Sequence, residues 1–557
     1  MNLSIPVSDQ QAVMTHVVKM DELAASNRFA AADEATVQAV LEGAAQFAEG
    51  EFWPLNRVGD ETGSRLKNGE VTTPPGFQQA YKAFVEGGWM TLSAPEEWGG
   101  QSMPLALSAA LMENLNASNI AFALCPMLSL GAVEALEAYG SDELKERYLP
   151  KIVSGEWPAT MNLTEPQAGS DVGALSTKAT PNEDGSWSIS GQKIYITWGE
   201  HDLAENIVHL VLARTPGAPE GTRGISLFLV PKFLPDGTRN DLVCAGLEEK
   251  MGIHASPTCV MRYGEKDGAK GWMIGPENNG MRAMFVMMNN ARLNVALQGV
   301  GIAEVATQRA VAYALDRKQG VRGGEEVTIS EHPDVRRMLL RMRSLTMAAR
   351  ALTYYAFSLL DRRATGDEEA GYRAEVLTPL AKAWGTDIGC EVASLGVQVH
   401  GGMGYVEETG AAQHLRDARI APIYEGTNGI QAADLVMRKL GLDGGLAFDG
   451  LIADIRAEVR HEGLVALTDT VEITAASLRE AGPDDRLAGS YPFLTMCAVL
   501  VGGWLLERLA HAEGASARTK AAADFFATVI APEALGLGAA ATEGAAMLYK
   551  VEAEALA

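Results

Sequence analysis

Apolar residues recur at helical spacing in the first and last parts of the chain, whereas a central segment alternates between apolar and polar residues. Between residues 36 and 155, positions such as Val37 and Leu41 repeat every three or four residues, which predicts helices. Beyond the central segment, an apolar stripe that includes Met338 and Leu352 has the same period. A stripe of this kind is typical of a helix in a bundle.

The central segment reads as a group of strands. Apolar and polar residues alternate over residues 186–197, 206–213 and 225–230. Clusters of glycine, proline and aspartate separate these runs, as expected for turns between strands. We therefore expect a compact antiparallel β domain between two helical regions.

The predicted fold class is α+β and mostly helical. No repeat of fixed period and no low-complexity tract interrupts this order. The expected parts are an N-terminal arm (1–35), an N-terminal helical domain (36–155), a central antiparallel β-barrel-like domain (156–279), a C-terminal four-helix bundle (280–441) and an additional helical region (442–557).

The net charge of the chain limits the classes of partner that it can bind. Its 557 residues include 46 Lys and Arg against 71 Asp and Glu, a formal net charge of −25. A negative field of this size repels phosphate backbones and anionic lipid, so we expect no nucleic acid partner and no membrane. Any phosphate site must be built from local arginines, lysines and helix N-termini.

Cysteine spacing and the apolar runs indicate a cytoplasmic protein. The five cysteines are far apart and odd in number, so we expect neither a bound metal nor a disulfide framework. The first twenty residues lack the pattern of a signal peptide. The longest uncharged apolar run, residues 493–506, suits a buried helix and is short for a membrane span.

Two segments near the predicted β domain carry hydrogen-bond donors of the kind that a bound ligand needs. LTEPQAGSDVG (163–173) combines turn formers with hydroxyl groups and backbone amides. KIYIT (193–197) begins thirty positions after the start of this segment. Such donors suit the edge of a planar heterocycle and a pyrophosphate. A turn capped by an aspartate is the alternative for the first segment alone.

Together these segments resemble the flavin-binding face of the acyl-CoA dehydrogenase family. The resemblance implies bound FAD, with Thr164 and Thr197 at the ring edge and Tyr195 beside the ring. Ser170 would contact the cofactor or the CoA phosphate of the substrate. Tyrosine replaces the usual tryptophan at 195, and Trp198-Gly199 replaces a more common Asn-Gly, so these contacts differ from the family pattern.

Two arginines in the region that follows match family positions. Arg292 matches the arginine that lies near the CoA arm of the substrate, although a solvated arginine at a helix start would look the same. Gly299 and Gly301 half-match a dinucleotide pattern, and close helix packing explains them better. Arg317 matches the arginine that reaches the FAD pyrophosphate of a neighbouring subunit, with Gln319 in place of phenylalanine.

The segment from Gln398 onwards, QVHGGMGYVEETG, resembles a family segment that contacts flavin through its backbone. By that resemblance Gln398, Gly401 and Gly402 are cofactor-binding residues. His400 could be read as catalytic, but the backbone role of this segment favours a packing role. Further along, the adjacent Arg416 and Asp417 match a family pair that is expected to form a buried ion pair and brace the site.

The segment IYEGT (423–427) is expected to supply the catalytic carboxylate. The α-proton of a thioester is weakly acidic, so its removal needs a positioned base whose pKa burial has raised. Apolar neighbours give Glu425 such a setting. By the resemblance, Glu425 and Gly426 hold the substrate, the Glu425 amide and a flavin ribityl hydroxyl hold the thioester oxygen, and Thr427 contacts the flavin.

The resemblance covers roughly residues 40–440 and implies FAD-dependent α,β-dehydrogenation of an acyl-CoA. Electron-transferring flavoprotein is the expected acceptor and a homodimer the expected assembly. The length resembles a long subgroup whose substrates include 3-(methylthio)propanoyl-CoA, so this thioester or another short- or medium-chain acyl-CoA is the candidate substrate. An acyl-CoA oxidase is the alternative enzyme. A nucleic-acid-binding relative is disfavoured, because residues 442–557 hold 17 acidic and eight basic residues.

Overall fold

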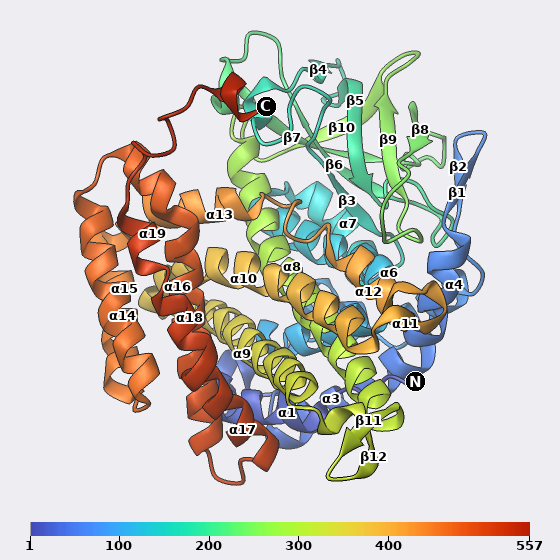
Figure 1. Cartoon of the computed structure of the whole chain (residues 1–557). Coiled ribbons are helices and arrows are strands. Elements are labelled where there is room, and N and C mark those ends of the chain that lie inside the picture. Colours follow the sequence, from blue (N-terminus) through green and yellow to red (C-terminus); the bar gives the residue numbers. More distant parts are fainter. Residues whose placement is uncertain (1) are drawn as a thin grey trace. The chain divides into compact units, whose positions relative to one another are not determined.

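The computed structural model describes residues 2–557 (Figure 1). These residues form two compact units. Unit 1 comprises the chain up to Ala45, Pro104–Ala117 and Arg292–Ala557, and unit 2 comprises Gln46–Met103 and Ser118–Ala291. The division falls within α3 (Glu34–Phe47), α6 (Leu105–Tyr139) and α8 (Gly280–Asp316), each of which contributes residues to both units.

Unit 2 contains the large sheet. Its strand order is β3-β6-β7-β10-β5-β9-β8, with β4 paired to β5. The sheet is open and barrel-like only in a loose sense, and β3 pairs with β6 in parallel, so the prediction of a wholly antiparallel domain was wrong at this edge. The strands are β3 (Ala159–Asn162), β4 (Lys178–Pro181), β5 (Trp187–Thr197), β6 (Val208–Ala213), β7 (Ser226–Pro231), β8 (Leu242–Leu247), β9 (Thr258–Tyr263) and β10 (Ala269–Ile274).

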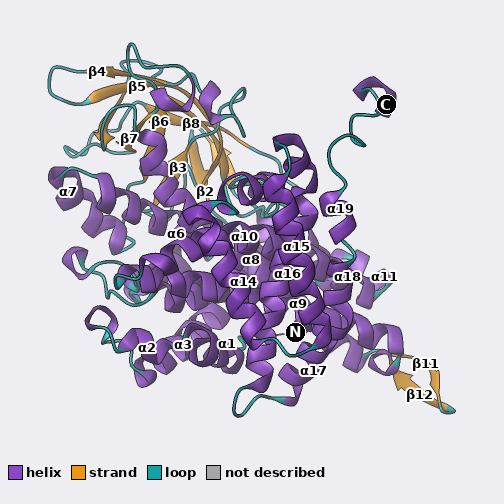
Figure 2. Cartoon of the chain, turned by 90° about the vertical axis from the view of Figure 1, so that its left-hand side faces the viewer, coloured by secondary structure: helices purple, strands orange, loops and turns teal. Residues whose placement is uncertain are grey.

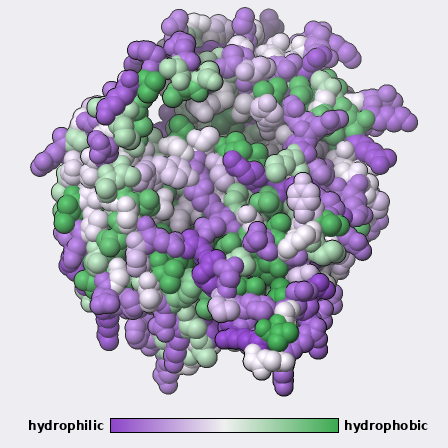
Figure 3. All heavy atoms as spheres, viewed as in Figure 1, coloured by the Kyte–Doolittle hydropathy of each residue, from purple (hydrophilic) through white to green (hydrophobic). Residues whose placement is uncertain are grey.

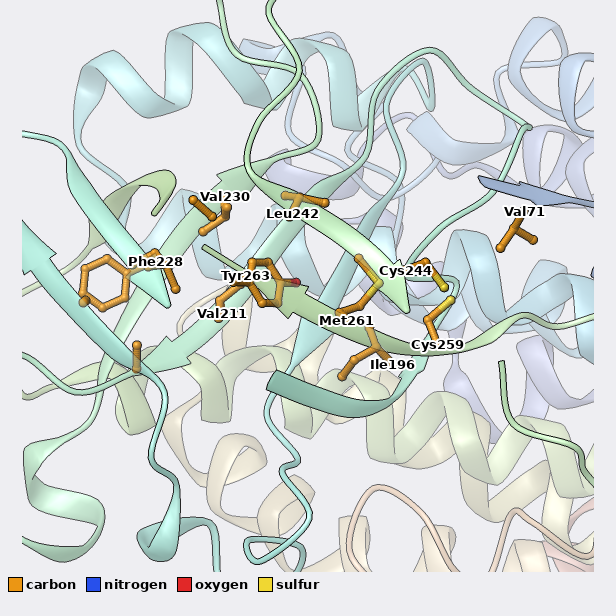
Figure 4. Packing of buried hydrophobic residues seen from close by; sticks show 14 residues of the cluster. Val71, Ile196, Val211, Phe228, Val230, Leu242, Cys244, Cys259, Met261 and Tyr263 are labelled. Carbon is orange, nitrogen blue, oxygen red and sulfur yellow. The ribbon is translucent and has the colours of Figure 1, made fainter. Parts of the chain in front are cut away.

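The three predicted strand segments correspond to β5, β6 and β7. In β6 and β7, however, buried and exposed residues do not alternate. Every residue of β6 and β7 is buried, because both strands are central in the sheet and are covered on both faces. Figure 4 shows Val211, Phe228 and Tyr263 packed in the same apolar cluster as the two cysteines Cys244 and Cys259.

The rest of unit 2 is helical except for one hairpin. Strands β1 (Arg65–Lys67) and β2 (Glu70–Thr72) pair antiparallel within a region predicted to be helical, so that prediction was wrong there. Asn68 and Gly69 both have positive φ, which allows the tight turn between the strands. The helices beside the hairpin and the sheet are α4 (Trp53–Thr62), α5 (Phe77–Glu86) and α7 (Asp142–Val153).

Unit 1 is built around long helices, with α9 and α10 packed together along most of their length. Pro333 occupies the first turn of α9, and the Asp367 carboxylate accepts the Ala370 amide at the start of α10. Figure 2 shows the hairpin of β11 (Lys318–Arg322) and β12 (Glu325–Thr328) extending from the helices. The other helices before residue 441 are α1 (Val7–Val13), α2 (Met20–Ala24), α9 (Pro333–Ala364), α10 (Glu368–His400), α11 (Gly402–Tyr405), α12 (Ala411–Ala418) and α13 (Asn428–Asp434).

Glycines allow α8 to approach its neighbours closely. A β-carbon on Gly299 would lie 2.0 Å from the Gly385 carbonyl oxygen of α10, and one on Gly301 would lie 2.7 Å from the Ala117 amide nitrogen. The prediction that these two glycines serve helix packing is confirmed.

A buried ion network crosses the centre of unit 1. The Arg350 guanidinium contacts Glu113 at 2.7 Å and Glu304 at 2.8 Å, and Arg343 contacts Glu304 at 3.0 Å. Burial by itself would raise the pKa of Glu304, but the two arginines hold it well below its usual range. These contacts join α6, α8 and α9, and no sequence period marks them.

The C-terminal region folds back on unit 1, where α16 and α17 pack against α9, and α16 also contacts α10 and α13 (Figure 1). The Trp504 ring lies edge-on to Tyr355 at 5.6 Å, and a β-carbon on Gly502 would lie 2.8 Å from the Trp384 ring. The helices of this region are α14 (Leu446–Glu458), α15 (Glu462–Glu480), α16 (Pro483–His511), α17 (Ala517–Phe525), α18 (Ala531–Leu535) and α19 (Gly538–Thr542).

By length and composition, three helices among residues 2–557 could cross a membrane: α6, α16 and the run Ala517–Thr542. In their most apolar windows, 89% of α6 and 83% of α16 are buried, so packing within the protein accounts for their hydropathy. The share is 33% for the third run. On the face drawn in Figure 3, hydrophobic residues are scattered among hydrophilic ones.

Candidate functional site

The segment between α12 and α13 carries Glu425 on a strained turn. Glu425 has φ +55° and Gly426 has φ +83°, in the left-handed region that a residue with a side chain rarely adopts. The Ile423 amide donates to the Ile420 carbonyl at 2.9 Å, and the Asn428 amide donates to the Pro422 carbonyl at 3.0 Å. These bonds fix the turn on both sides of Glu425.

Gly426 is required by space as well as by conformation. A β-carbon there would lie 2.8 Å from Nε2 of Gln431 and 3.8 Å from a terminal nitrogen of Arg292. The same contact places the Arg292 guanidinium, which is 7% exposed, beside the turn. The structure thus brings together Arg292, Glu425, Gly426 and Thr427, all of which the sequence indicated.

Two cations influence the Glu425 carboxyl. Burial raises its pKa above the usual value, and Arg292 and Lys382 oppose the shift. The carboxyl is only partly exposed to solvent, and its neighbour Tyr424 donates its hydroxyl to the Gln298 side chain. A carboxylate in this setting is a stronger base than a solvated one, and the nearby cations favour its charged form.

Sequence reasoning missed Lys382. Its ammonium group is fully buried on α10, donating to the Gly426 carbonyl at 2.8 Å and to the Asn428 side chain at 2.9 Å. Burial lowers the pKa of Lys382 to about 7, and Glu425 and Asp387 oppose the shift. A lone lysine in an otherwise apolar stretch, PLAKAWG, was the available signal.

Thr427 has a local structural duty. Its hydroxyl oxygen accepts the Ile430 amide at 3.2 Å and caps α13. The hydroxyl proton is still available to a ligand, because the capping bond uses the oxygen as an acceptor.

A second group of predicted residues lies at the other ends of the long helices. Arg317 follows α8 directly and is exposed, with its guanidinium 3.3 Å from the Gln319 side chain. Gln398, Gly401 and Gly402 lie where α10 ends, and Gly401 has φ +59°. By helical rise, Arg317 is about 37 Å from Arg292 along α8, so the two arginines cannot hold one phosphate.

His400 lies within this second group as a packed residue. It is 5% exposed, its ring stacks on Tyr313 at 4.3 Å, and its Nδ1 is 2.7 Å from the Gly396 carbonyl. This environment supports the packing role over a catalytic one. Beyond it, Arg416 contacts Glu407 at 2.8 Å, and the Gln413 amide donates to Asp417 at 3.2 Å.

In unit 2, a buried ion pair joins the two flavin-type segments. Lys193 contacts Glu165 at 2.8 Å, and both side chains are shielded from solvent. Burial by itself would raise the pKa of Glu165, but Lys193 and the donors Thr177 and Ser176 lower it to about 2. The charges in TEP and KIYIT therefore hold the loop against β5, and these two residues were not predicted.

Tyr195 lies at an irregularity of β5. The pairing of β5 with β9 shifts register between Lys193 and Ile196, and Tyr195 has φ +59° with 59% of its surface exposed. Backbone strain and an exposed aromatic ring at one position are typical of a ligand contact. Trp198 differs, because it is 1% exposed and donates its indole N–H to the Ala121 carbonyl at 3.1 Å.

The other predicted residues of unit 2 are accessible. Thr164 and Thr197 are partly exposed and Ser170 is exposed. Within residues 2–557, the Thr164 and Ser170 hydroxyls are not committed to another group, while the Thr197 carbonyl accepts the Thr160 hydroxyl at 2.6 Å. With the exposed ring of Tyr195, these hydroxyls fit a flavin ring and its polar edge.

Comparison with known proteins gives the class. Models of the N-terminal, middle and C-terminal domains of acyl-CoA dehydrogenases match residues 34–156, 160–265 and 278–440. A further model, described as acetyl-CoA dehydrogenase C-terminal like, matches residues 451–552. The protein is thus an oxidoreductase, and the chain belongs to the acyl-CoA dehydrogenase family.

Relatives extend over nearly the whole chain. It is 46% identical to 3-methylmercaptopropionyl-CoA dehydrogenase of Ruegeria pomeroyi, over 95% of each chain. It is 34% identical to the broad-specificity linear acyl-CoA dehydrogenase FadE5 of Mycobacterium tuberculosis, over 90% of this chain and 89% of the other. The structure of Caenorhabditis elegans ACDH-11 has the same fold, with a TM-score of 0.80, 22% identity and coverage of 94% and 91%.

Membership of the family makes the protein a flavoprotein of fatty acid metabolism, with FAD as its cofactor. The residues present fit this group. An exposed aromatic ring on a strained bulge, uncommitted hydroxyls in the adjoining loop and an exposed arginine are the donor types that a flavin and its pyrophosphate need.

Proposed function

We propose that the protein catalyses α,β-dehydrogenation of an acyl-CoA thioester, with Glu425 as the base that removes the α-proton. The position of Glu425 carries the proposal: a carboxylate on a strained turn, with a pKa raised by burial, beside the cations Arg292 and Lys382. When bound, FAD would supply the acceptor for the β-hydride. The Glu425 amide donates to the thioester oxygen, which stabilises the charge that develops there.

Arg292 has a second role in this proposal. It lies against Gly426, and its charge is held close to the carboxylate by burial. Before proton removal, the positive charges of Arg292 and Lys382 favour the ionised form of Glu425, and the arginine also attracts the anionic CoA arm. Ser170, in the exposed loop of unit 2, is the second proposed contact to the substrate.

The proposed substrate is 3-(methylthio)propanoyl-CoA or another short- or medium-chain acyl-CoA. Support comes from the identity of 46% with a protein named for the first of these thioesters. Mixing the yellow protein anaerobically with a series of acyl-CoAs of different length and branching, and following flavin bleaching, tests both reaction and substrate. No bleaching with any of the series contradicts the proposed function.

The proposed electron acceptor is electron-transferring flavoprotein. The protein itself is proposed to be a cytoplasmic homodimer. Family membership supports the acceptor, and the C-terminal helices packed on α9 support the dimer, because they cover a face of the bundle. Admitting air to the substrate-reduced protein separates the alternatives. Slow reoxidation with little peroxide supports a dehydrogenase, and rapid reoxidation with peroxide identifies an oxidase.

Arg317→Ala should weaken FAD retention more than it changes the chemical step. The proposed partner of Arg317 is the pyrophosphate of FAD in a neighbouring subunit, and the residue is about 37 Å along α8 from Arg292. Flavin content after extended dialysis is the measurement. Arg336→Ala, which removes an exposed arginine of α9, is the control and should retain the native flavin content. Equal retention by both variants would contradict the role of Arg317.

A further inference from the structure

A residue of the C-terminal region reaches toward the catalytic turn. Tyr491 of α16 donates its hydroxyl to Oδ2 of Asp387 on α10, at 2.5 Å. The other carboxylate oxygen of Asp387 accepts the Asn428 side-chain amide at 2.8 Å. The two helices are thus joined through a carboxylate whose oxygens both have protein donors.

The contacts continue from Asn428 to the turn itself. Its amide oxygen accepts the Lys382 ammonium at 2.9 Å, and Lys382 donates to the Gly426 carbonyl at 2.8 Å. The Asn428 amide nitrogen also donates to the Ala383 carbonyl at 3.0 Å. Four polar side chains therefore connect α16 to the carbonyl of Gly426, the residue that follows Glu425.

Burial fixes which groups donate and which accept in this series of contacts. Lys382 is 0% exposed and Asn428 is 4% exposed, so neither can exchange its partners for solvent. An ammonium group has donors only, and the amide nitrogen of Asn428 is directed to Asp387 and Ala383. The amide oxygen must then face Lys382, and Asp387 is one of three acceptors, with Ala383 and Thr386, that hold the amide nitrogen in this orientation.

We propose that Tyr491 is a positioning residue for the reaction: through Asp387 and Asn428 it fixes the ammonium of Lys382 against the Gly426 carbonyl, and so fixes the turn that carries Glu425. The proposal rests on the proposed role of Glu425. It gives the additional helical region a part in catalysis, beyond the covering of apolar surface.

The charged and polar groups around Asp387 and Lys382 determine in which direction the loss of the Tyr491 hydroxyl would shift the pKa of Glu425. Lys382 faces Glu425 and Asp387, with Arg292 on α8, and Asp387 faces Arg419, Asn428 and Tyr491. Burial raises the pKa of Asp387, and the Tyr491 hydrogen bond opposes this shift. Without the hydroxyl, Asp387 carries less negative charge, which stabilises the Lys382 ammonium less. Glu425 then faces a weaker cation, and its pKa rises further.

Tyr491→Phe tests the proposal in the full-length, FAD-loaded protein. We expect kcat to fall roughly three- to tenfold with little change in KM, because the turn loses one of the several contacts that hold it in position. We also expect the acid limb of the kcat profile to move up by roughly 0.3–0.5 pH units. Tyr372→Phe, on α10 and similarly exposed (39% against 40%), is the control and should keep the native profile.

Asp387→Asn and the double variant decide whether Tyr491 acts through Asp387. If it does, Tyr491→Phe has no further effect on kcat or on the acid limb once Asp387 is changed. A native pH profile for Tyr491→Phe overturns the proposal. So does a lower thermal midpoint with an unmoved profile, which would mean that Tyr491 only tethers α16.

The outcome for Glu425→Gln keeps the two proposals apart. Native turnover by that variant would overturn the proposed base, and with it the role of Tyr491. Loss of turnover by Glu425→Gln combined with a native Tyr491→Phe enzyme would overturn the positioning role alone.

Discussion

Replacing Glu425 by glutamine should leave a yellow protein that binds acyl-CoA but reduces its flavin roughly 10²–10⁴-fold more slowly. Glutamine has nearly the shape of glutamate and can occupy the turn beside Arg292, yet its amide cannot accept the α-proton. Stopped-flow bleaching of the flavin under anaerobic conditions measures the effect. Glu408→Gln removes one exposed carboxylate 17 positions earlier in the chain and should bleach at the native rate.

The pH dependence gives a second check on the same substitution. The base must be deprotonated, so the native bleaching rate should fall as pH decreases through the pKa of Glu425, which burial raises above its usual value. The glutamine variant has no such carboxyl and should lose this limb. Native bleaching by Glu425→Gln, or an acid limb that survives the substitution, would show that another group is the base.

Ending the chain at Gly441 should abolish the soluble native assembly and cause aggregation or a larger assembly. The truncation removes α16, so the surfaces of α9 and α10 that α16 covers, including the ring of Trp384 against which Gly502 packs, would become exposed. Burying one large apolar side chain is worth about 1.5–3 kcal/mol, and a domain is stable by only about 5–15 kcal/mol, so the loss of several such contacts exceeds the margin. The apolar residues of α16 that are buried include Phe493, Leu494, Val499, Leu500, Trp504 and Leu505.

Size-exclusion chromatography with light scattering measures the result. The matched control ends the chain at Ala545, which removes only the exposed residues 546–557 and keeps every helix from α14 to α19. The control should elute as the native assembly. A soluble, unchanged dimer after truncation at Gly441 would contradict the view that this region completes the core of unit 1.

Local features of the fold and site could be predicted from the sequence. Apolar patterns placed three strands of the sheet, β5, β6 and β7, and the long helices, because regular structure leaves a repeat in the sequence. The motifs around Thr164, Tyr195 and Glu425 were recognisable because their turn residues lie close together in the chain. The packing role of Gly299 and Gly301 followed from the absence of a preceding strand, and the approach of α10 confirms it.

Contacts between distant segments could not be predicted. The pairing of β3 with β6 in parallel depends on a connection that passes through β4 and β5, and no period records it. Likewise, Lys193 and Glu165 form an ion pair although they are 28 positions apart, and composition does not predict contacts at that separation.

Around the proposed base, the sequence by itself determined a carboxylate on a turn and an arginine in the helix that follows the β domain. Only the tertiary structure decided that Lys382 lies buried beneath Gly426 and that Tyr491, 104 positions from Asp387, completes the contacts. The reason is physical. A buried charge is stable only where folding brings it partners, and those partners can come from any part of the chain.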